Sequence, residues 1–282
     1  MTKPIQVSEW RRLASAEVAS EDAEALLQFV TGWSPTQIFL RGDELLSADQ
    51  MGQLDACLSR RRDGEPVAYI TGSRGFWTMD LEVNEHTLIP RADTETLIEA
   101  VLHRVDRNAP LRILDLGTGS GAIALALASE LKNASIVATD QSERALDVAR
   151  RNATKHNIAN VTFKQGNWFG AIEDGDHFDI IVTNPPYIPV SDEHLEQGDL
   201  RFEPTSALVS GTDGLDDIRE ILANAVRHLR QGGRVLIEHG YDQGANVREL
   251  MSIAGLKKIT TLRDFGGNER VTMGIMLENV GT

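Results

Sequence analysis

The run Asn184-Pro185-Pro186-Tyr187 combines residue types that can hold a planar amino group. It follows the apolar segment 178–183, and two consecutive prolines cannot continue the hydrogen-bonding ladder of a sheet. The prolines therefore fix the directions of the Asn184 side chain and the Pro185 carbonyl. Those two oxygens can accept both hydrogens of an –NH2 group, while Tyr187 packs over the plane of that group.

Such a cradle leaves the nitrogen lone pair free to attack a methyl carbon on a neighbouring sulfonium. The displacement depends mainly on positioning, which can contribute roughly 7–11 kcal/mol. If the nitrogen belongs to an amide, acceptors on its hydrogens oppose resonance and stabilise the positive charge that develops. The motif contains no general base. A rigid loop that only ends a strand is the alternative interpretation of these residues.

A glycine-rich run follows another apolar segment, 112–116, and precedes a segment rich in Ala and Leu. Glycine allows a sharp turn from strand to helix and lets a ligand approach the backbone without a Cβ in the way. The ligand would lie at the N-terminus of the helix. A tight turn without a ligand is the alternative. The residues of this run that we predict to bind a cofactor are Gly117, Thr118, Gly119, Ser120 and Gly121.

Asp140 ends the next apolar segment, about twenty residues after the glycine run, where a carboxylate can accept hydrogen bonds from ribose hydroxyls. A helix N-cap is the alternative role, and it is compatible with the first. A nicotinamide dinucleotide would use the same carboxylate, so these two motifs do not separate a methyltransferase from a dehydrogenase. Asn167 and Trp168 follow a third such segment, where Trp168 offers a wall for adenine and Asn167 an amide for its edge. Core packing is the alternative for Trp168.

The elements that must position these residues alternate between strands and helices from about residue 92 onward. Continuous apolar strands between helices predict a buried, mostly parallel, doubly wound α/β sheet with helices on both faces. Two terminal strands with no helix between them must be antiparallel. The predicted strands are Arg112–Leu116, Ser135–Asp140, Val161–Gln165, Phe178–Thr183, Arg234–Glu238, Lys257–Arg263 and Arg270–Met276. The predicted helices are Ala122–Leu131, Ser142–His156, Asp216–Leu229 and Gln243–Ala254.

The first third of the chain instead has apolar residues at helical spacing, which predicts a small helical bundle. We expect this bundle over residues 1–75, a hairpin linker over 76–90, and the catalytic domain over 91–282. The bundle holds no catalytic constellation, so we expect it to recognise a protein substrate.

Composition narrows the range of partners. The 282 residues carry a net charge of −14, which argues against a large phosphate-binding face. No apolar run is long enough to span a membrane and no signal peptide is visible, so a cytoplasmic protein is expected. The single cysteine, Cys57, and the absence of Cys/His spacing predict neither a disulfide nor a metal site.

Several segments resemble the peptide chain release factor N5-glutamine methyltransferase family. The resemblance covers nearly the whole chain, and its segments are RRRDGEPVAYITG (60–72), FW (76–77), LIPRADTE (88–95), ILDLGTGSGAIALALASE (113–130), NPPYI (184–188), QGDLRFEP (197–204), IEHG (237–240) and GNERVT (267–272). It implies the class I S-adenosylmethionine-dependent methyltransferase fold, with S-adenosylmethionine as cofactor and S-adenosylhomocysteine as product. It also implies that the acceptor is the glutamine of the Gly-Gly-Gln loop of class I release factors.

The resemblance carries cofactor contacts onto Gly117–Gly121, Asp140, Trp168 and Asn184, and the glutamine cradle onto residues 184–187. The chain departs from the family pattern at two positions. Asn167 stands where Asp is common, which lowers the weight on a carboxylate–adenine contact, and Ala92 stands where Pro is usual.

Some interpretations remain open at this point. The polar residues 93–95 match the family but equally suit a helix N-cap. Phe76 and Trp77 either cover the cofactor or fill a domain interface, and His239 is expected to be structural. The rival functions are an N6-adenine methyltransferase acting on nucleic acid and a non-catalytic cofactor-binding module.

Overall fold

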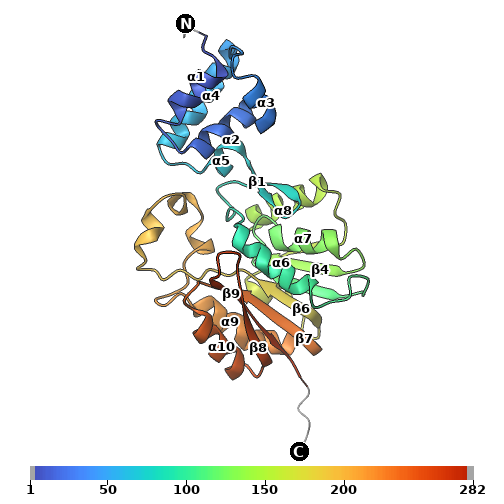
Figure 1. Cartoon of the computed structure of the whole chain (residues 1–282). Helices are drawn as coiled ribbons and strands as arrows, with labels where there is room; N and C mark the ends of the chain where they lie inside the picture. Colours follow the sequence, from blue (N-terminus) through green and yellow to red (C-terminus); the bar gives the residue numbers. More distant parts are fainter. Residues whose placement is uncertain (1–3, 278–282) are drawn as a thin grey trace, which may run out of the picture. The chain divides into compact units, whose positions relative to one another are not determined.

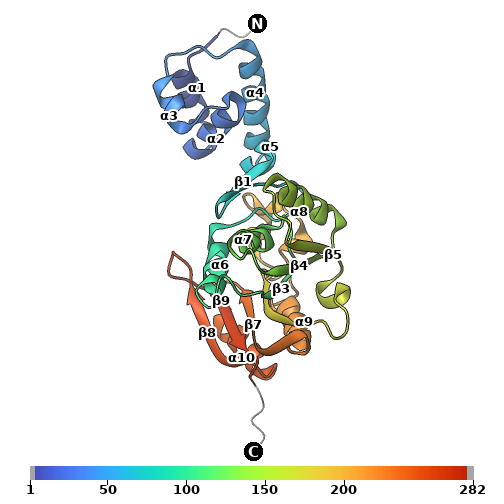
Figure 2. The same ribbon diagram turned by 90° about the vertical axis from the view of Figure 1, so that its right-hand side faces the viewer.

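The computed structural model describes residues 4–277. The chain forms two compact units, one of Met1–Ser73 with Glu196–Phe202, and one of Arg74–Leu195 with Glu203–Thr282. Figures 1 and 2 show the elements of each unit from two directions. The boundaries at 75/76 and 90/91, and the roles given to the parts, stay predictions.

The first unit is a helical bundle around one apolar core. Its helices are α1 (Val7–Ala14), α2 (Ser20–Thr31), α3 (Pro35–Leu40), α4 (Ala48–Arg62) and α5 (Val67–Thr71). Two of them begin at capping boxes, in which a serine side chain and a glutamine side chain each bond the other's backbone N–H. The serine of the α4 capping box is Ser47. Trp10, Leu26 and Leu54 lie in the core.

The basic run at the end of α4, Arg60 to Arg62, forms ion pairs with carboxylates. Arg60 pairs with Glu65, and Arg62 pairs with Glu17. Arg61 pairs with Asp22 at 2.7 Å and with Asp199 at 2.9 Å. Asp199 belongs to the segment Glu196–Phe202, so this ion pair joins that segment to the helices of the first unit. The run is therefore not available as a patch of free positive charge.

The second unit contains a seven-stranded sheet in the order β5-β4-β3-β6-β7-β9-β8. Its strands are β3 (Arg112–Leu116), β4 (Ser135–Asp140), β5 (Val161–Gln165), β6 (Phe178–Thr183), β7 (Leu229–Glu238), β8 (Lys257–Arg263) and β9 (Glu269–Ile275). Strands β3 to β7 are parallel, and β9 runs antiparallel between β7 and β8. The predicted doubly wound, mostly parallel sheet with an antiparallel terminal strand is confirmed.

Helices cover both faces of this sheet because the apolar strands are buried on both sides (Figures 1 and 2). Alternation along β3 sends Ile113 to one core and Leu114 to the other. The first core contains residues of α6 (Glu95–Leu102) and α7 (Ala122–Glu130), and the second contains residues of α9 (Asp216–Ala225) and α10 (Gly244–Ile253). Helix α8 (Glu143–Lys155) follows β4.

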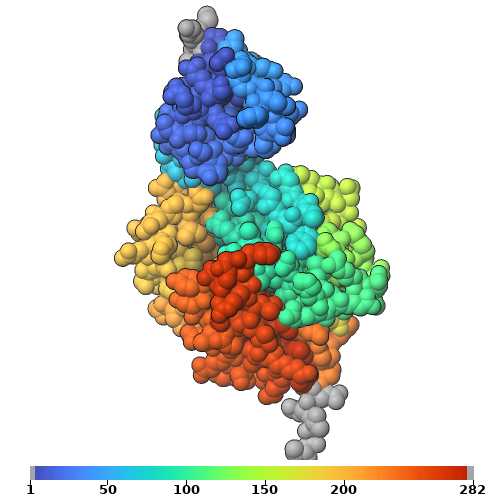
Figure 3. Space-filling view, in the orientation of Figure 1, coloured from blue at the N-terminus to red at the C-terminus, as the bar shows by residue number. Residues whose placement is uncertain are grey.

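The remaining elements are short. A hairpin is formed by β1 (Ser73–Phe76) and β2 (Met79–Glu82), and the 3-10 turns are η1 (Ala92–Thr94), η2 (Trp168–Ala171), η3 (Glu193–Glu196), η4 (Leu200–Phe202), η5 (Thr205–Ala207) and η6 (Val226–His228). Helix α9 ends at Ala225, earlier than predicted, because η6 and the longer strand β7 take the following residues. In Figure 3 the red surface of the β8–β9 hairpin lies beside the green surface of α6, two segments far apart in sequence that are in contact.

Strand register brings the predicted site residues to one edge of the sheet. Leu116 at the end of β3 lies opposite both Thr139 of β4 and Thr183 of β6. Thr183 in turn lies opposite Ile237 of β7. The segments that follow these strands therefore begin side by side, at the carboxyl edge where ligands bind in such sheets.

Candidate active site

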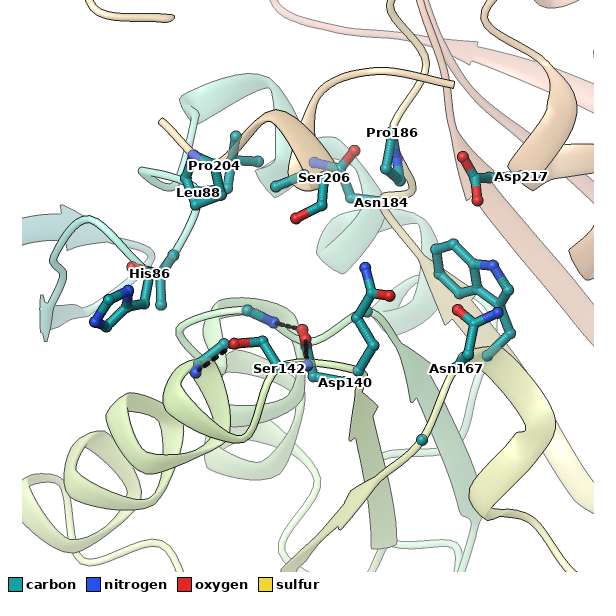
Figure 4. A pocket seen from close by; sticks show the side chains of 18 of the residues that line it. His86, Leu88, Asp140, Ser142, Asn167, Asn184, Pro186, Pro204, Ser206 and Asp217 are labelled. Carbon is teal, nitrogen blue, oxygen red and sulfur yellow. Dashed lines mark hydrogen bonds between the residues drawn. The ribbon is translucent and has the colours of Figure 1, made fainter. Parts of the chain in front are cut away.

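A cavity of about 390 Å³ opens at this edge, within the second unit (Figure 4). Predicted residues on its walls are Gly117, Gly119, Asp140, Asn167, Trp168, Asn184 and Pro186. Asp140 and Ser142 lie on one wall, and Asn184, Pro186 and Ser206 lie across from them. The structure thus brings together residues from four separate predicted segments. Thr118, Ser120, Gly121, Pro185 and Tyr187 are not part of the cavity lining.

The glycine run forms a turn whose backbone angles favour glycine. Gly117, Gly119 and Gly121 all have positive φ, at 72°, 55° and 86°. A Cβ on Gly117 would lie 3.1 Å from the Trp168 ring, and one on Gly121 would lie 3.0 Å from Leu125. Gly121 is also the N-cap of α7. The run therefore leaves an open backbone wall beside the start of a helix.

Asp140 holds this turn with both carboxylate oxygens. Oδ2 accepts a hydrogen bond from the Gly119 N–H and Oδ1 accepts one from the Ser142 N–H, each at 2.9 Å. Burial raises the pKa of Asp140 above its usual value, while these two bonds oppose the shift. Ser142, not Asp140, caps α8, through a 3.2 Å bond from the Ala145 N–H to Oγ. Each carboxylate oxygen can accept a second hydrogen bond, and Asp140 lines the cavity.

Asp115, for which the sequence suggested no role, is fully buried beneath the glycine run. Its Oδ2 accepts from the Thr118 hydroxyl at 2.6 Å and from the Ala124 N–H at 3.2 Å. Its Oδ1 has no hydrogen-bond partner in the part of the chain that the structure describes. Burial raises the pKa of Asp115 to about 7. The sequence feature that could have revealed Asp115 is a charged residue inside an otherwise apolar strand. The hydroxyl of Thr118 donates to this carboxylate.

Trp168 adopts a left-handed backbone conformation, with φ at 45°, which residues other than glycine seldom adopt. The Thr139 hydroxyl donates to its carbonyl at 3.3 Å, and its ring packs against the second core. The neighbouring Asn167 donates from Nδ2 to Glu220 Oε1 at 3.3 Å. One of the two Asn167 amide hydrogens is thus engaged, and the amide oxygen can accept a hydrogen bond from a ligand.

Asn184, on the opposite wall, also uses its amide nitrogen in a hydrogen bond. Its Nδ2 donates to the Thr94 hydroxyl oxygen at 3.2 Å, and Thr94 is buried. Thr94 therefore does not act as a helix N-cap, and no side-chain cap is present at η1 or α6. The N-cap interpretation of residues 93–95 is wrong because this hydroxyl turns toward Asn184 instead.

Backbone packing fixes the segment that follows the two prolines. The Tyr187 carbonyl accepts a hydrogen bond from Gln243 Nε2 at 3.0 Å. Gly214 passes so close to that carbonyl that a Cβ on Gly214 would lie 2.2 Å from the oxygen. Burial, assisted by the negative charge of Glu238, raises the pKa of the Tyr187 phenol, so the side chain stays neutral.

An ion pair to a buried carboxylate anchors the loop that forms the far wall. Arg91 pairs with Glu203, whose side chain is fully buried, and the Ile89 N–H donates to the same carboxylate at 3.0 Å. The residues just after Glu203 include Pro204 and Ser206, which line the cavity. Leu88 and Pro204 lie in segments that resemble the family, but the sequence indicated no role for the other wall residues, which include Glu85, His86, Thr87, Ser206, Ala207 and Asp217.

Three further expectations can be compared with the structure. Phe76 lies in the first core, and Trp77 donates from its indole nitrogen to Glu130 at 2.9 Å. Neither lines the cavity. His239 is buried and bonds the Thr272 hydroxyl at 2.8 Å, which fits a structural role. Within residues 4–277 there is no cluster of three His, Cys, Asp or Glu residues that suits a metal, and no helix has the length and apolar character to cross a membrane.

Comparison with known proteins adds to this geometry. A family model described as a methyltransferase domain matches residues 108–267, and one described as the PrmC N-terminal domain matches residues 10–72. A release factor glutamine methyltransferase of Xylella fastidiosa is 51% identical over 261 residues, which is 93% of this chain and 94% of the relative. The protein of the same name from Escherichia coli is 49% identical over 93% of this chain and 94% of the relative.

This chain belongs to the release factor glutamine methyltransferase family. A relative of the same name from Pseudomonas aeruginosa is 50% identical over 93% of this chain and 95% of its own length. The family assignment covers both units and the whole of the cavity wall described above.

Solved structures place the fold of this family member among the class I methyltransferases. A methyltransferase from Pyrococcus furiosus matches 82% of this chain and 100% of its own, with a TM-score of 0.53 and 16% identity. A 16S rRNA methyltransferase from T. thermophilus matches 72% of this chain and 49% of its own, with a TM-score of 0.53 and 20% identity. These likenesses concern the fold, which agrees with the predicted class.

Proposed function

We propose that this protein transfers a methyl group from S-adenosylmethionine to the side-chain amide nitrogen, N5, of the glutamine in the Gly-Gly-Gln motif of class I peptide chain release factors. The observation that carries the proposal is Asn184 on the cavity wall. Its amide nitrogen is held by Thr94 at 3.2 Å, which leaves its oxygen to accept a substrate N–H. Membership of the family over nearly the full chain supports the choice of acceptor.

The cavity residues suit S-adenosylmethionine as the methyl donor, which becomes S-adenosylhomocysteine on transfer. Asp140 has lone pairs free to accept from ribose hydroxyls, and Trp168 offers an apolar face to adenine. Gly117 and Gly119 adopt positive φ and carry no side chain, so a ligand can approach their backbone closely. When bound, the cofactor supplies an activated methyl group on a sulfonium.

Asn167 can replace the more common carboxylate in adenine recognition. The exocyclic amino group of adenine is a donor, so its partner must be an acceptor. Because Asn167 Nδ2 is engaged by Glu220 at 3.3 Å, its oxygen takes the acceptor role that one oxygen of an Asp would have. The departure from the family pattern therefore keeps the hydrogen bond while removing a charge.

The chain's contribution to transfer is positioning. When Asn184 Oδ1 and the Pro185 carbonyl accept the two amide hydrogens, the nitrogen lone pair, which lies perpendicular to the amide plane, is left free to react. S-adenosylmethionine held in the cavity would supply the methyl carbon, and the amide nitrogen would lose one proton after the transfer. The two acceptors stabilise positive charge at nitrogen before that proton leaves.

The first unit is proposed to grip the release factor. Phe39 and Leu40 of α3 are 76% and 75% exposed, and large apolar side chains at such exposure are typical of contact surfaces. A partner of the translation machinery implies that the enzyme acts in the cytoplasm. The observed pairing of Arg60, Arg61 and Arg62 with carboxylates does not favour nucleic acid as an alternative substrate.

The test is transfer of labelled methyl from S-adenosylmethionine to purified, unmethylated release factor. A matched factor with Gly-Gly-Ala in place of Gly-Gly-Gln serves as the control. Label on the first factor alone would support glutamine as the acceptor. Equal label on both factors, or label on DNA with none on either factor, would refute the proposed substrate.

A further inference from the structure

Glu238 is a buried carboxylate beside the Asn184 cradle that the transfer mechanism above does not use. It ends β7 and is 1% exposed. The register of β6 and β7 pairs Thr183 with Ile237, so Asn184 and Glu238 follow neighbouring positions on adjacent strands. Oε2 of Glu238 has no hydrogen-bond partner among the described residues. A buried charge that lacks full compensation is costly, so its retention calls for an explanation.

The side chains around Glu238 are those of the cradle itself. The hydroxyls of Thr94 and Tyr187 both act on the Glu238 carboxylate as side-chain donors that lower its pKa, which places them beside it. Thr94 also contacts Asn184, whose Nδ2 lies 3.2 Å from the Thr94 hydroxyl oxygen. One carboxylate is therefore linked to Asn184 through Thr94 and directly to Tyr187, the last residue of the cradle.

The chemistry of these groups gives the chain of hydrogen bonds a direction. An ionised carboxylate can only accept, so the single hydroxyl hydrogen of Thr94 points toward Glu238. The lone pairs of that hydroxyl then face Asn184 and require a donor. Asn184 must present Nδ2 to Thr94, and its oxygen is turned the other way.

We propose that Thr94, oriented by Glu238, is a positioning residue that turns the Asn184 carboxamide so that its oxygen faces the substrate nitrogen. Without this direction, the Asn184 amide group could present its –NH2 to the substrate –NH2, and two donors repel. The same carboxylate holds the Tyr187 phenol, so it aligns both side chains of the cradle. This inference rests on the proposed function of the cradle.

The local charges keep Glu238 able to play this part. Arg270 of β9 favours the ionised carboxylate, and Asp93 of η1 opposes it. Arg270 itself lies 3.0 Å from Asp264 and 3.4 Å from Asp93. Burial is the largest influence and raises the pKa of Glu238 to about 7, so the carboxylate is mostly ionised in mildly alkaline solution.

The test compares three threonine variants of the full chain for labelled-methyl transfer to release factor at pH 8. Thr94→Val keeps the shape but removes the hydroxyl, and Thr94→Ser keeps the hydroxyl. Thr183→Val is the matched control, because Thr183 is also fully buried and bonds a carbonyl, that of Leu116, at 2.7 Å. The melting temperature and the affinity for S-adenosylhomocysteine are measured for each.

For Thr94→Val we expect kcat to fall about 10- to 100-fold, the scale for losing a group that orients a functional side chain without touching the substrate. S-adenosylhomocysteine affinity should change less than about threefold, and Thr94→Ser should restore most of kcat. Thr183→Val should lower the melting temperature to a similar extent with kcat nearly kept. If Thr94→Val keeps wild-type kcat, or if Thr94→Ser is as slow as Thr94→Val, the inference is overturned while the proposed function stands. Failure of the wild-type enzyme to label the factor would overturn both.

Discussion

Replacing Glu238 with Gln should make the protein slower but not less stable at pH 8. Burial raises the pKa of Glu238 from 4.5 to about 7. At 1.36 kcal/mol per pKa unit, the ionised carboxylate costs the folded state roughly 3 kcal/mol. The amide side chain removes that cost, but it places an –NH2 near the position of the unpartnered Oε2, which returns about 1–3 kcal/mol. The expected free energy of unfolding is therefore equal to wild type or higher by up to about 2 kcal/mol.

The sign of the pH dependence follows from the raised pKa. Between pH 4.5 and 7 the folded state of the wild type binds a proton that the unfolded state does not, so stability rises as pH falls through this range. Any advantage of Glu238→Gln at pH 8 should therefore shrink toward pH 4.5. Urea unfolding at pH 8, 6 and 5 measures this trend for both proteins.

Activity should move in the opposite direction from stability. A Gln side chain can donate to Thr94 as well as accept from it, so the direction imposed on Asn184 is lost. We expect kcat to fall about tenfold or more at pH 8, in a variant that is at least as stable as wild type. If Glu238→Gln lowers the free energy of unfolding as well as kcat, Glu238 acts only by supporting the fold. That result would refute the reasoning.

The remaining predictions concern the cradle, the cofactor and the first unit. Asn184→Ala should lower kcat about 100-fold or more while S-adenosylhomocysteine affinity by calorimetry changes by less than about threefold; unchanged turnover would remove the cradle argument. Asp140→Asn should weaken cofactor binding about 10- to 100-fold, since one bond to a charged acceptor is worth roughly 1.5–3 kcal/mol, and an unaltered Kd would contradict the ribose role. Phe39→Ser with Leu40→Ser should raise KM for intact release factor about tenfold but leave a Gly-Gly-Gln peptide unaffected. Equal effects on both substrates would locate the defect outside a docking surface.

Local patterns predicted the parts of the site that depend on short-range constraints. The glycine run, with Gly117 and Gly121 at positive φ, follows its strand and precedes its helix as expected, because only glycine adopts that turn freely. Asp140 reaches the cavity because it ends a strand, and strand ends of a parallel sheet share an edge. These residues are determined by their own neighbours in the chain.

Local patterns failed where a side chain had two possible partners. Thr94 suits a helix N-cap equally well, and the structure instead turns it to Asn184, ninety positions away. Thr118 was predicted as a cofactor-binding residue, and its hydroxyl donates to the buried Asp115 at 2.6 Å. In both cases the choice is between hydrogen bonds of similar strength, and the fold decides which partner is near.

The sequence by itself determined the order of strands and helices, the glycine turn at 117–121 and the rigid run at 184–187, because these depend on periodicity, glycine and proline. The tertiary structure decided which residues lie opposite the glycine turn and beside the run at 184–187. The buried Glu203 anchors a loop from far along the chain, and the register of β6 and β7 brings Glu238 beside Asn184. Such pairings join residues that no local spacing relates, so they exist only once the sheet has formed.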